Sequence, residues 1–123
     1  MPTSHFVILY VADPIASATF YARLLGQAPI ESSPGFAMFG VAPGLMLGLW
    51  ARADVQPAVE TRAGGGEFAF ALDGNAEVDA WHARWRDAGC RITQAPVAMD
   101  FGYTFVAEDP DGHRLRVFAP TGA

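Results

Sequence analysis

The residues in this sequence best suited to chemistry are three histidines and a single cysteine, and they are widely scattered. His5 lies in a strand-like run, His82 in a helix-like segment and His113 directly after a turn. One cysteine, Cys90, can form neither an internal disulfide nor, alone, a zinc or iron–sulfur centre. No Ser-His-Asp or Cys-His pairing emerges from this spacing. We therefore predict no catalytic residues.

Charge and hydropathy exclude two classes of partner. The 123 residues carry a formal net charge of -5, and the eight basic residues are all arginine, spread from Arg23 to Arg116. This is no electrostatic footprint for nucleic acid or for an anionic membrane. The apolar run Phe6–Ala12 is too short to span a bilayer and has no leader-like flanks. We expect a cytoplasmic protein with neither kind of partner.

The elements that position these residues follow one order twice, strand–helix–strand–strand–strand. A linker from residue 53 to 66, which contains three successive glycines and no helix or strand pattern, separates the halves. The expected strands are His5–Val11, Ala28–Ser32, Gly35–Val41 and Leu45–Arg52, then Glu67–Leu72, Arg91–Val97, Tyr103–Ala107 and Arg114–Phe118.

Helix signals complete each half. Asp13-Pro14 predicts the start of the first helix and Gly26 its end. Asp73 or Asn75 is expected to cap the second, which Gly89 closes.

Two motifs resemble a known superfamily. Tyr10–Asp13, Phe20-Tyr21 and Leu24–Gly26 resemble the opening of the vicinal oxygen chelate superfamily (glyoxalase, bleomycin resistance protein and dioxygenase), and Glu108–His113 resembles its closing turn. The resemblance implies one α+β domain over residues 1–123, in which two βαβββ modules form curved mixed sheets around a cup. The modules would span about residues 4–52 and 67–120. A homodimer is also implied, since members of the superfamily commonly pair modules between chains.

Strand parity predicts which side chains face the cup. On the last strand, Leu115 and Val117 favour burial under a helix, so Arg116 and Phe118 face the cup together with Arg114. The same parity argument, applied to the strand Glu67–Leu72, predicts that the side chain of Glu67 also faces the cup. Both faces of the first and fourth strands are apolar, and there the position within the superfamily motif turns Phe6, Ile8, Tyr10, Met46, Gly48 and Trp50 inward.

Metal-dependent members place one ligand on each of four strands. Those positions are here Phe6, Gly48, Glu67 and Arg116, of which only Glu67 could bind a metal. We therefore predict no metal and no cofactor, and expect Glu67 and Arg116 to form an ion pair. A one-residue register slip would turn His5 inward, which keeps a metal-dependent glyoxalase- or dioxygenase-like enzyme as an alternative.

Aromatic residues predict the ligand. Phe36–Phe39, Leu47–Trp50 and the segment from Phe101 to His113 most resemble the phenazine antibiotic resistance protein, a ligand-sequestering member. We expect a metal-free protein that sequesters a planar aromatic molecule, for example a phenazine antibiotic; a non-catalytic interaction module is a further alternative. Trp50 would be the main contact beside the room left by Gly48, and Arg116 would meet a ligand carboxylate. The expected site comprises Trp50, Phe6, Tyr10, Phe36, Phe39, Gly48, Glu67, Arg116 and Phe118.

Overall fold

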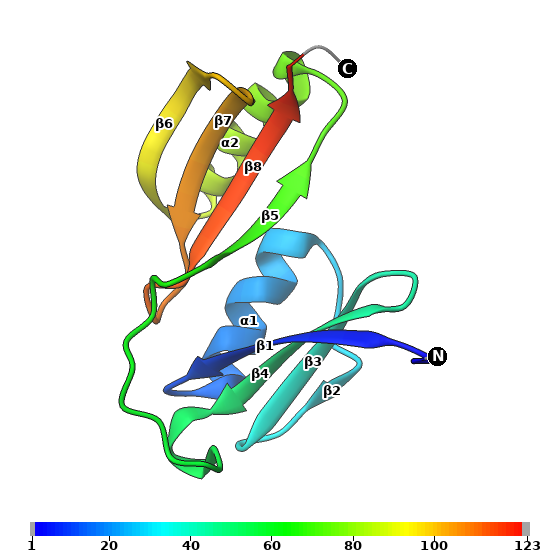
Figure 1. Cartoon of the computed structure of the whole chain (residues 1–123), viewed down its shortest axis with the longest axis vertical. Coiled ribbons are helices and arrows are strands. Elements are labelled where there is room, and N and C mark those ends of the chain that lie inside the picture. Colours follow the sequence, from blue (N-terminus) through cyan, green and yellow to red (C-terminus); the bar gives the residue numbers. More distant parts are fainter. Residues whose placement is uncertain (1, 122–123) are drawn as a thin grey trace. The chain divides into compact units, whose positions relative to one another are not determined.

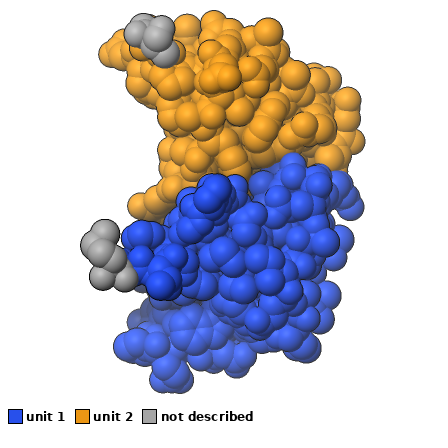
Figure 2. Space-filling view, turned by 90° about the vertical axis from the view of Figure 1, so that its right-hand side faces the viewer, with its two compact units in different colours: residues 1–62 blue, residues 63–123 orange. Residues whose placement is uncertain are grey.

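The computed structural model describes residues 2–121, which fall into two compact units, residues 2–62 and 63–121 (Figure 2). Each unit has the element order βαβββ. In the first unit these elements are β1 (His5–Val11), α1 (Pro14–Leu25), β2 (Glu31–Ser32), β3 (Phe36–Ala42) and β4 (Leu45–Ala51). In the second they are β5 (Glu67–Ala71), α2 (Asn75–Asp87), β6 (Arg91–Met99), β7 (Gly102–Glu108) and β8 (Arg114–Pro120).

The first unit is a four-stranded sheet with the order β1-β4-β3-β2 and one helix on one face (Figure 1). β1 runs parallel to β4, whereas β4, β3 and β2 are successively antiparallel. Side chains alternate between the faces of a strand, and the alternate residues beneath α1 form the core. The fully buried residues there include Val11, Tyr21, Phe39, Leu47 and Leu49.

Local signals define α1. The carboxylate of Asp13 accepts hydrogen bonds from the backbone N–H groups of Ile15 and Ala16, which have no partner within the helix. The chain leaves the helix at Gly26, whose φ of 68° is easily adopted only by a residue without a Cβ. Both ends agree with the sequence-based expectation.

The second unit repeats the arrangement with the strand order β5-β8-β7-β6 and with α2 on one face (Figure 1). Leu115 and Val117 are fully buried, which confirms the parity expected for β8. Phe70 of β5 packs its ring against Trp81 and Trp85 of α2. The expected fold class, α+β with two βαβββ modules, is confirmed.

Several boundaries differ from the expectation. β2 has only two residues, because its pairing with β3 covers Glu31 and Ser32 alone. α2 begins after Gly74 without a side-chain cap, so neither Asp73 nor Asn75 caps it. A short 3-10 turn, Arg52–Asp54, follows β4, and residues 55–66 contain no helix or strand. Neither described helix is long and apolar enough to cross a membrane.

The two helix starts predict a difference in stability. Asp13→Ala removes two capping hydrogen bonds and should lower the free energy of unfolding by about 1 kcal/mol. Asp73→Ala is the matched control, because Asp73 is exposed and makes no capping hydrogen bond, and it should change that free energy by only a few tenths of a kcal/mol. Urea unfolding of both variants measures the difference, and equal losses would contradict the assignment of the caps.

Candidate ligand-binding site

The face of the first sheet turned away from α1 carries a cluster of aromatic and aliphatic side chains. Val11 is fully buried beneath the helix, so Phe6, Ile8 and Tyr10, at the alternate positions of β1, lie on the other face. Phe6 and Ile8 are 49% and 43% exposed. Tyr10 pairs with Trp50 across β1 and β4, and their ring centroids lie 6.2 Å apart in an edge-to-face arrangement. The structure thus brings Phe6, Tyr10 and Trp50 onto one open face.

Phe36 and Gly48 are part of the same surface, with a different role from the one expected. A Cβ on Gly48 would lie 3.0 Å from Cζ of Phe36 and 3.4 Å from Cγ1 of Ile8. The ring of Phe36 therefore occupies the space above Gly48. The expectation that Gly48 leaves this space for a ligand is corrected: the glycine lets Phe36 lie down on the sheet next to Trp50, its partner across β3 and β4.

Phe39 does not belong to the open face. Its side chain is fully buried, and its ring packs against Tyr21 of α1 with centroids 6.3 Å apart. Phe36 and Phe39 are three positions apart on one strand, and an odd separation in a regular strand places two side chains on opposite faces. The expectation that both residues shape the pocket is therefore wrong for Phe39.

On the second sheet, Glu67 and Arg116 form a bidentate ion pair. Nε of Arg116 donates to Oε1 of Glu67 at 2.7 Å, and Nη2 of Arg116 donates to Oε2 at 2.9 Å. The arginine side chain is 17% exposed and the glutamate side chain 31%. The expected pairing of these two residues is confirmed. The hydrogen bonds from Arg116 are the main reason that the pKa of Glu67 lies below its usual value; burial opposes this shift, and the positive charges of Arg116 and Arg114 add to it.

Arg116 has further partners that sequence reasoning missed. Its Nη1 donates to the hydroxyl of Thr104, which is buried, and its guanidinium lies 5.6 Å from the ring centroid of Phe101. Phe101 in turn meets Phe118 edge to face at 5.8 Å. Because Glu67 already occupies the guanidinium edge that matches a carboxylate, the expectation that Arg116 is available for a ligand carboxylate is corrected.

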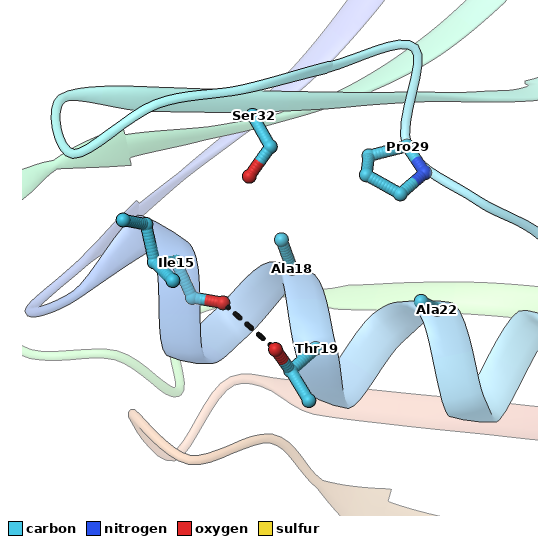
Figure 3. Close-up of a pocket in the computed structure, with 6 residues that line it drawn as sticks. All are labelled: Ile15, Ala18, Thr19, Ala22, Pro29 and Ser32. Atoms are coloured by element: carbon cyan, nitrogen blue, oxygen red, sulfur yellow. Dashed lines mark hydrogen bonds between the residues drawn. The ribbon is translucent and has the colours of Figure 1, made fainter.

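A cavity of about 280 Å³ lies between α1 and the segment that leads into β2 (Figure 3). Its walls are mostly small and apolar. The hydroxyl of Thr19 donates to the carbonyl of Ile15 at 3.2 Å and is thereby engaged within the helix. The cavity has few polar groups with which to bind a ligand and no charged one. It is lined by Ile15, Ala18, Thr19, Ala22, Pro29 and Ser32.

The thiol of Cys90 is not poised for nucleophilic chemistry. The residue is buried, and its Sγ donates to the carbonyl of Glu108 at 3.8 Å. Burial, with a smaller effect from the charge of Asp109, raises the pKa of the thiol to about 11. At neutral pH the reactive thiolate is therefore a very small fraction.

The residues present do not fit the metal site of the superfamily. His5 is paired with Leu45 in an unshifted register and has the parity of Val11, so it lies on the face opposite Phe6. Both carboxylate oxygens of Glu67 are bonded to Arg116. Within residues 2–121, no three His, Cys, Asp or Glu side chains are grouped so as to hold a metal ion. The register slip that would bring His5 inward does not occur.

Two βαβββ modules, each with one helix on a mixed four-stranded sheet, define the structural class of this protein. Residues 3–117 match the Glyoxalase/Bleomycin resistance protein/Dioxygenase superfamily, and the chain belongs to that superfamily. It is 25% identical over 118 residues to the phenazine antibiotic resistance protein EhpR of Enterobacter agglomerans, an alignment that covers 94% of this chain and 90% of EhpR. The superfamily and the relative expected from the sequence are both confirmed.

Solved structures agree with this assignment. The solution structure of protein ATC0852 from Agrobacterium tumefaciens is 50% identical with a TM-score of 0.88, covering 99% of this chain and 100% of that one. A glyoxalase-related enzyme from Fulvimarina pelagi is 25% identical with a TM-score of 0.84, covering 97% and 88%.

The ion pair yields a prediction on stability and pH. Glu67→Gln removes a charge-assisted, partly exposed pair and should lower the free energy of unfolding by about 1–2 kcal/mol at neutral pH. Because the pKa of Glu67 is lowered by folding, its contribution is complete above the ordinary value of 4.5 and is lost as the pH falls through the lower folded-state pKa. The gap between wild type and variant should therefore close in acid.

Urea unfolding at neutral and acidic pH measures this gap. Glu60→Gln, which removes the same charge from an exposed residue in the segment without helix or strand, is the matched control and should be nearly neutral. A gap of unchanged size in acid would contradict the role assigned to the ion pair.

Proposed function

We propose that this protein is a metal-free binding protein that sequesters a planar aromatic small molecule, with phenazine antibiotics as the first candidates. The observation that carries the proposal is the edge-to-face pair of Tyr10 and Trp50 on the sheet face that α1 leaves open. Phe6 and Ile8 beside it are half exposed. Sequestration needs affinity and no chemical step.

The physical case rests on what this face gains from a flat ligand. Large apolar side chains left in contact with water lose the stabilisation of about 25 cal/mol for each Å² that burial provides. A planar ring system covers several of them at once, and stacking on an aromatic side chain contributes about 0.5–1.5 kcal/mol beyond the buried area. Phe36, held flat over Gly48, supplies a ring next to Trp50.

The relative EhpR also supports the proposal. Its name states resistance to phenazine antibiotics, and the similarity extends over 94% of the present chain. A phenazine is a flat tricyclic ring system without a group that demands a metal. It therefore suits an aromatic surface whose neighbouring residues do not fit the metal site of the superfamily.

Replacement of Trp50 tests the site. Trp50→Ala should weaken the binding of phenazine by about tenfold or more, because a stacking partner and its buried area are lost. The midpoint of thermal unfolding should change little, since Trp50 lies on the open face and is not fully buried. Isothermal titration calorimetry and thermal unfolding measure the two quantities.

Trp81→Phe is the matched control, because Trp81 packs against Phe70 and Trp85 of the second unit and lies outside the proposed site. It should leave the phenazine affinity unchanged. Unchanged affinity of Trp50→Ala, together with a large loss of stability, would show that Trp50 only fills space. Failure of the wild-type protein to bind phenazine would overturn this ligand class.

We further propose that the protein is a homodimer. β1 is an edge strand of its sheet, and Phe6, Val7 and Ile8 are 49%, 36% and 43% exposed along it. An edge strand that offers unpaired backbone groups and apolar side chains is an unfavourable surface to leave in water. In a twofold-symmetric dimer the same surface of two copies meets, so the β1 edge of a second copy would cover this edge.

Multi-angle light scattering at micromolar concentration tests the dimer and should give twice the mass of the 13.1 kDa chain. Val7→Glu introduces a charge on this edge strand and should shift the population towards monomer. Val59→Glu, in the segment without helix or strand, is the control and should leave the mass unchanged. A monodisperse wild-type monomer would contradict the proposal.

A further inference from the structure

The second sheet carries a polar cavity of about 160 Å³ on the face turned away from α2. Leu115 and Val117 are buried on the helix side of β8, so Arg114 and Arg116 project from the opposite side. None of the lining residues is acidic; they are Thr93, Gln94, Val106, Arg114 and Arg116.

A bulge in β6 brings two neighbouring residues to this cavity. The register between β6 and β7 shifts between Ile92 and Gln94, so that Thr93 is an additional residue opposite Val106. Its hydroxyl donates to the carbonyl of Val106 at 3.2 Å, which ties the bulge to β7. In a regular strand, successive side chains point to opposite faces, whereas here Thr93 and Gln94 both line the cavity.

Two polar side chains at the cavity have unused hydrogen-bonding capacity. Oε1 of Gln94 is buried and has no partner among the described residues. Gln94 lines the cavity, and its amide NH2 group carries two N–H donors. Arg114 makes no side-chain hydrogen bond or ion pair within residues 2–121, unlike Arg116, which is bonded to Glu67 and Thr104.

The charges around the cavity favour an anion. Glu67 balances Arg116 through the ion pair already described. Glu67 on β5 and Glu108 on β7 are the cross-strand neighbours of Arg114, but neither forms an ion pair with that arginine in the described chain, and neither lines the cavity. Arg114 therefore presents a positive charge at a concave polar site, and a planar guanidinium fork matches the two oxygens of a carboxylate.

We infer that this cavity binds the carboxylate of a small organic acid, with Arg114 and the Gln94 amide as donors. The inference goes beyond the proposed function and rests on the second unit alone, whose residues line the whole cavity. Arg116 acts as a positioning residue, because its pairing with Glu67 and Thr104 holds one wall of the cavity in place.

Titration of ¹⁵N-labelled protein with benzoate, followed by NMR, tests the inference. Benzoate at millimolar concentration should shift the side-chain N–H signals of Gln94 and Arg114, and benzamide, its neutral analogue, should not. Arg114→Gln should raise the dissociation constant for benzoate at least tenfold. Arg86→Gln removes the same charge from an exposed position on α2 and should leave that constant unchanged.

Gln94→Leu keeps every charge and removes only the amide, so it tests the site even if Arg114→Gln fails to fold. It should weaken benzoate binding several-fold. Equal responses to benzoate and benzamide, the absence of any response to benzoate, or unchanged affinity in Gln94→Leu would overturn the inference. Loss of phenazine binding with benzoate binding intact overturns only the proposed function, whereas the reverse result overturns only the carboxylate site.

Discussion

Each sheet of this protein has one helix to cover it, and one helix buries only one face. In the first unit, α1 covers the residues of one parity, including Val11, Leu47 and Leu49, which are all but inaccessible to water. The residues of the other parity have no such cover, and Phe6 and Ile8 remain half exposed. The candidate site follows from this one-sided burial. Apolar side chains on the uncovered face are in contact with water, and a flat partner that binds there is favoured because it removes their apolar surface from water.

The two uncovered faces differ in chemistry. The first is aromatic and aliphatic, with Tyr10 and Trp50 in contact. The second is polar and built around the ion pair of Glu67 and Arg116. This pair engages both oxygens of the Glu67 carboxylate, so that within residues 2–121 Arg114 has no ion pair of its own.

The sequence could predict most of the fold because its halves repeat one pattern and their ends carry helix and turn signals such as Asp13-Pro14. It predicted the faces of β8 correctly because Leu115 and Val117 alternate with arginines, and burial of arginine under a helix is unfavourable. The prediction failed for Phe39, because both faces of that strand are apolar and hydrophobicity alone does not distinguish them. It also missed Thr93 and Gln94, since the bulge that brings them together depends on pairing with β7 and leaves no trace in the alternation of β6.

Binding of a planar aromatic molecule to the uncovered face of the first sheet can be tested by intermolecular nuclear Overhauser effects between phenazine and isotope-labelled protein, because these effects report which protons lie beside the ligand. We expect contacts from the phenazine ring to the side chains of Trp50 and Tyr10. Contacts confined to Ile15, Ala18 and Ala22, which line the cavity on the other side of the sheet beside α1, would contradict it.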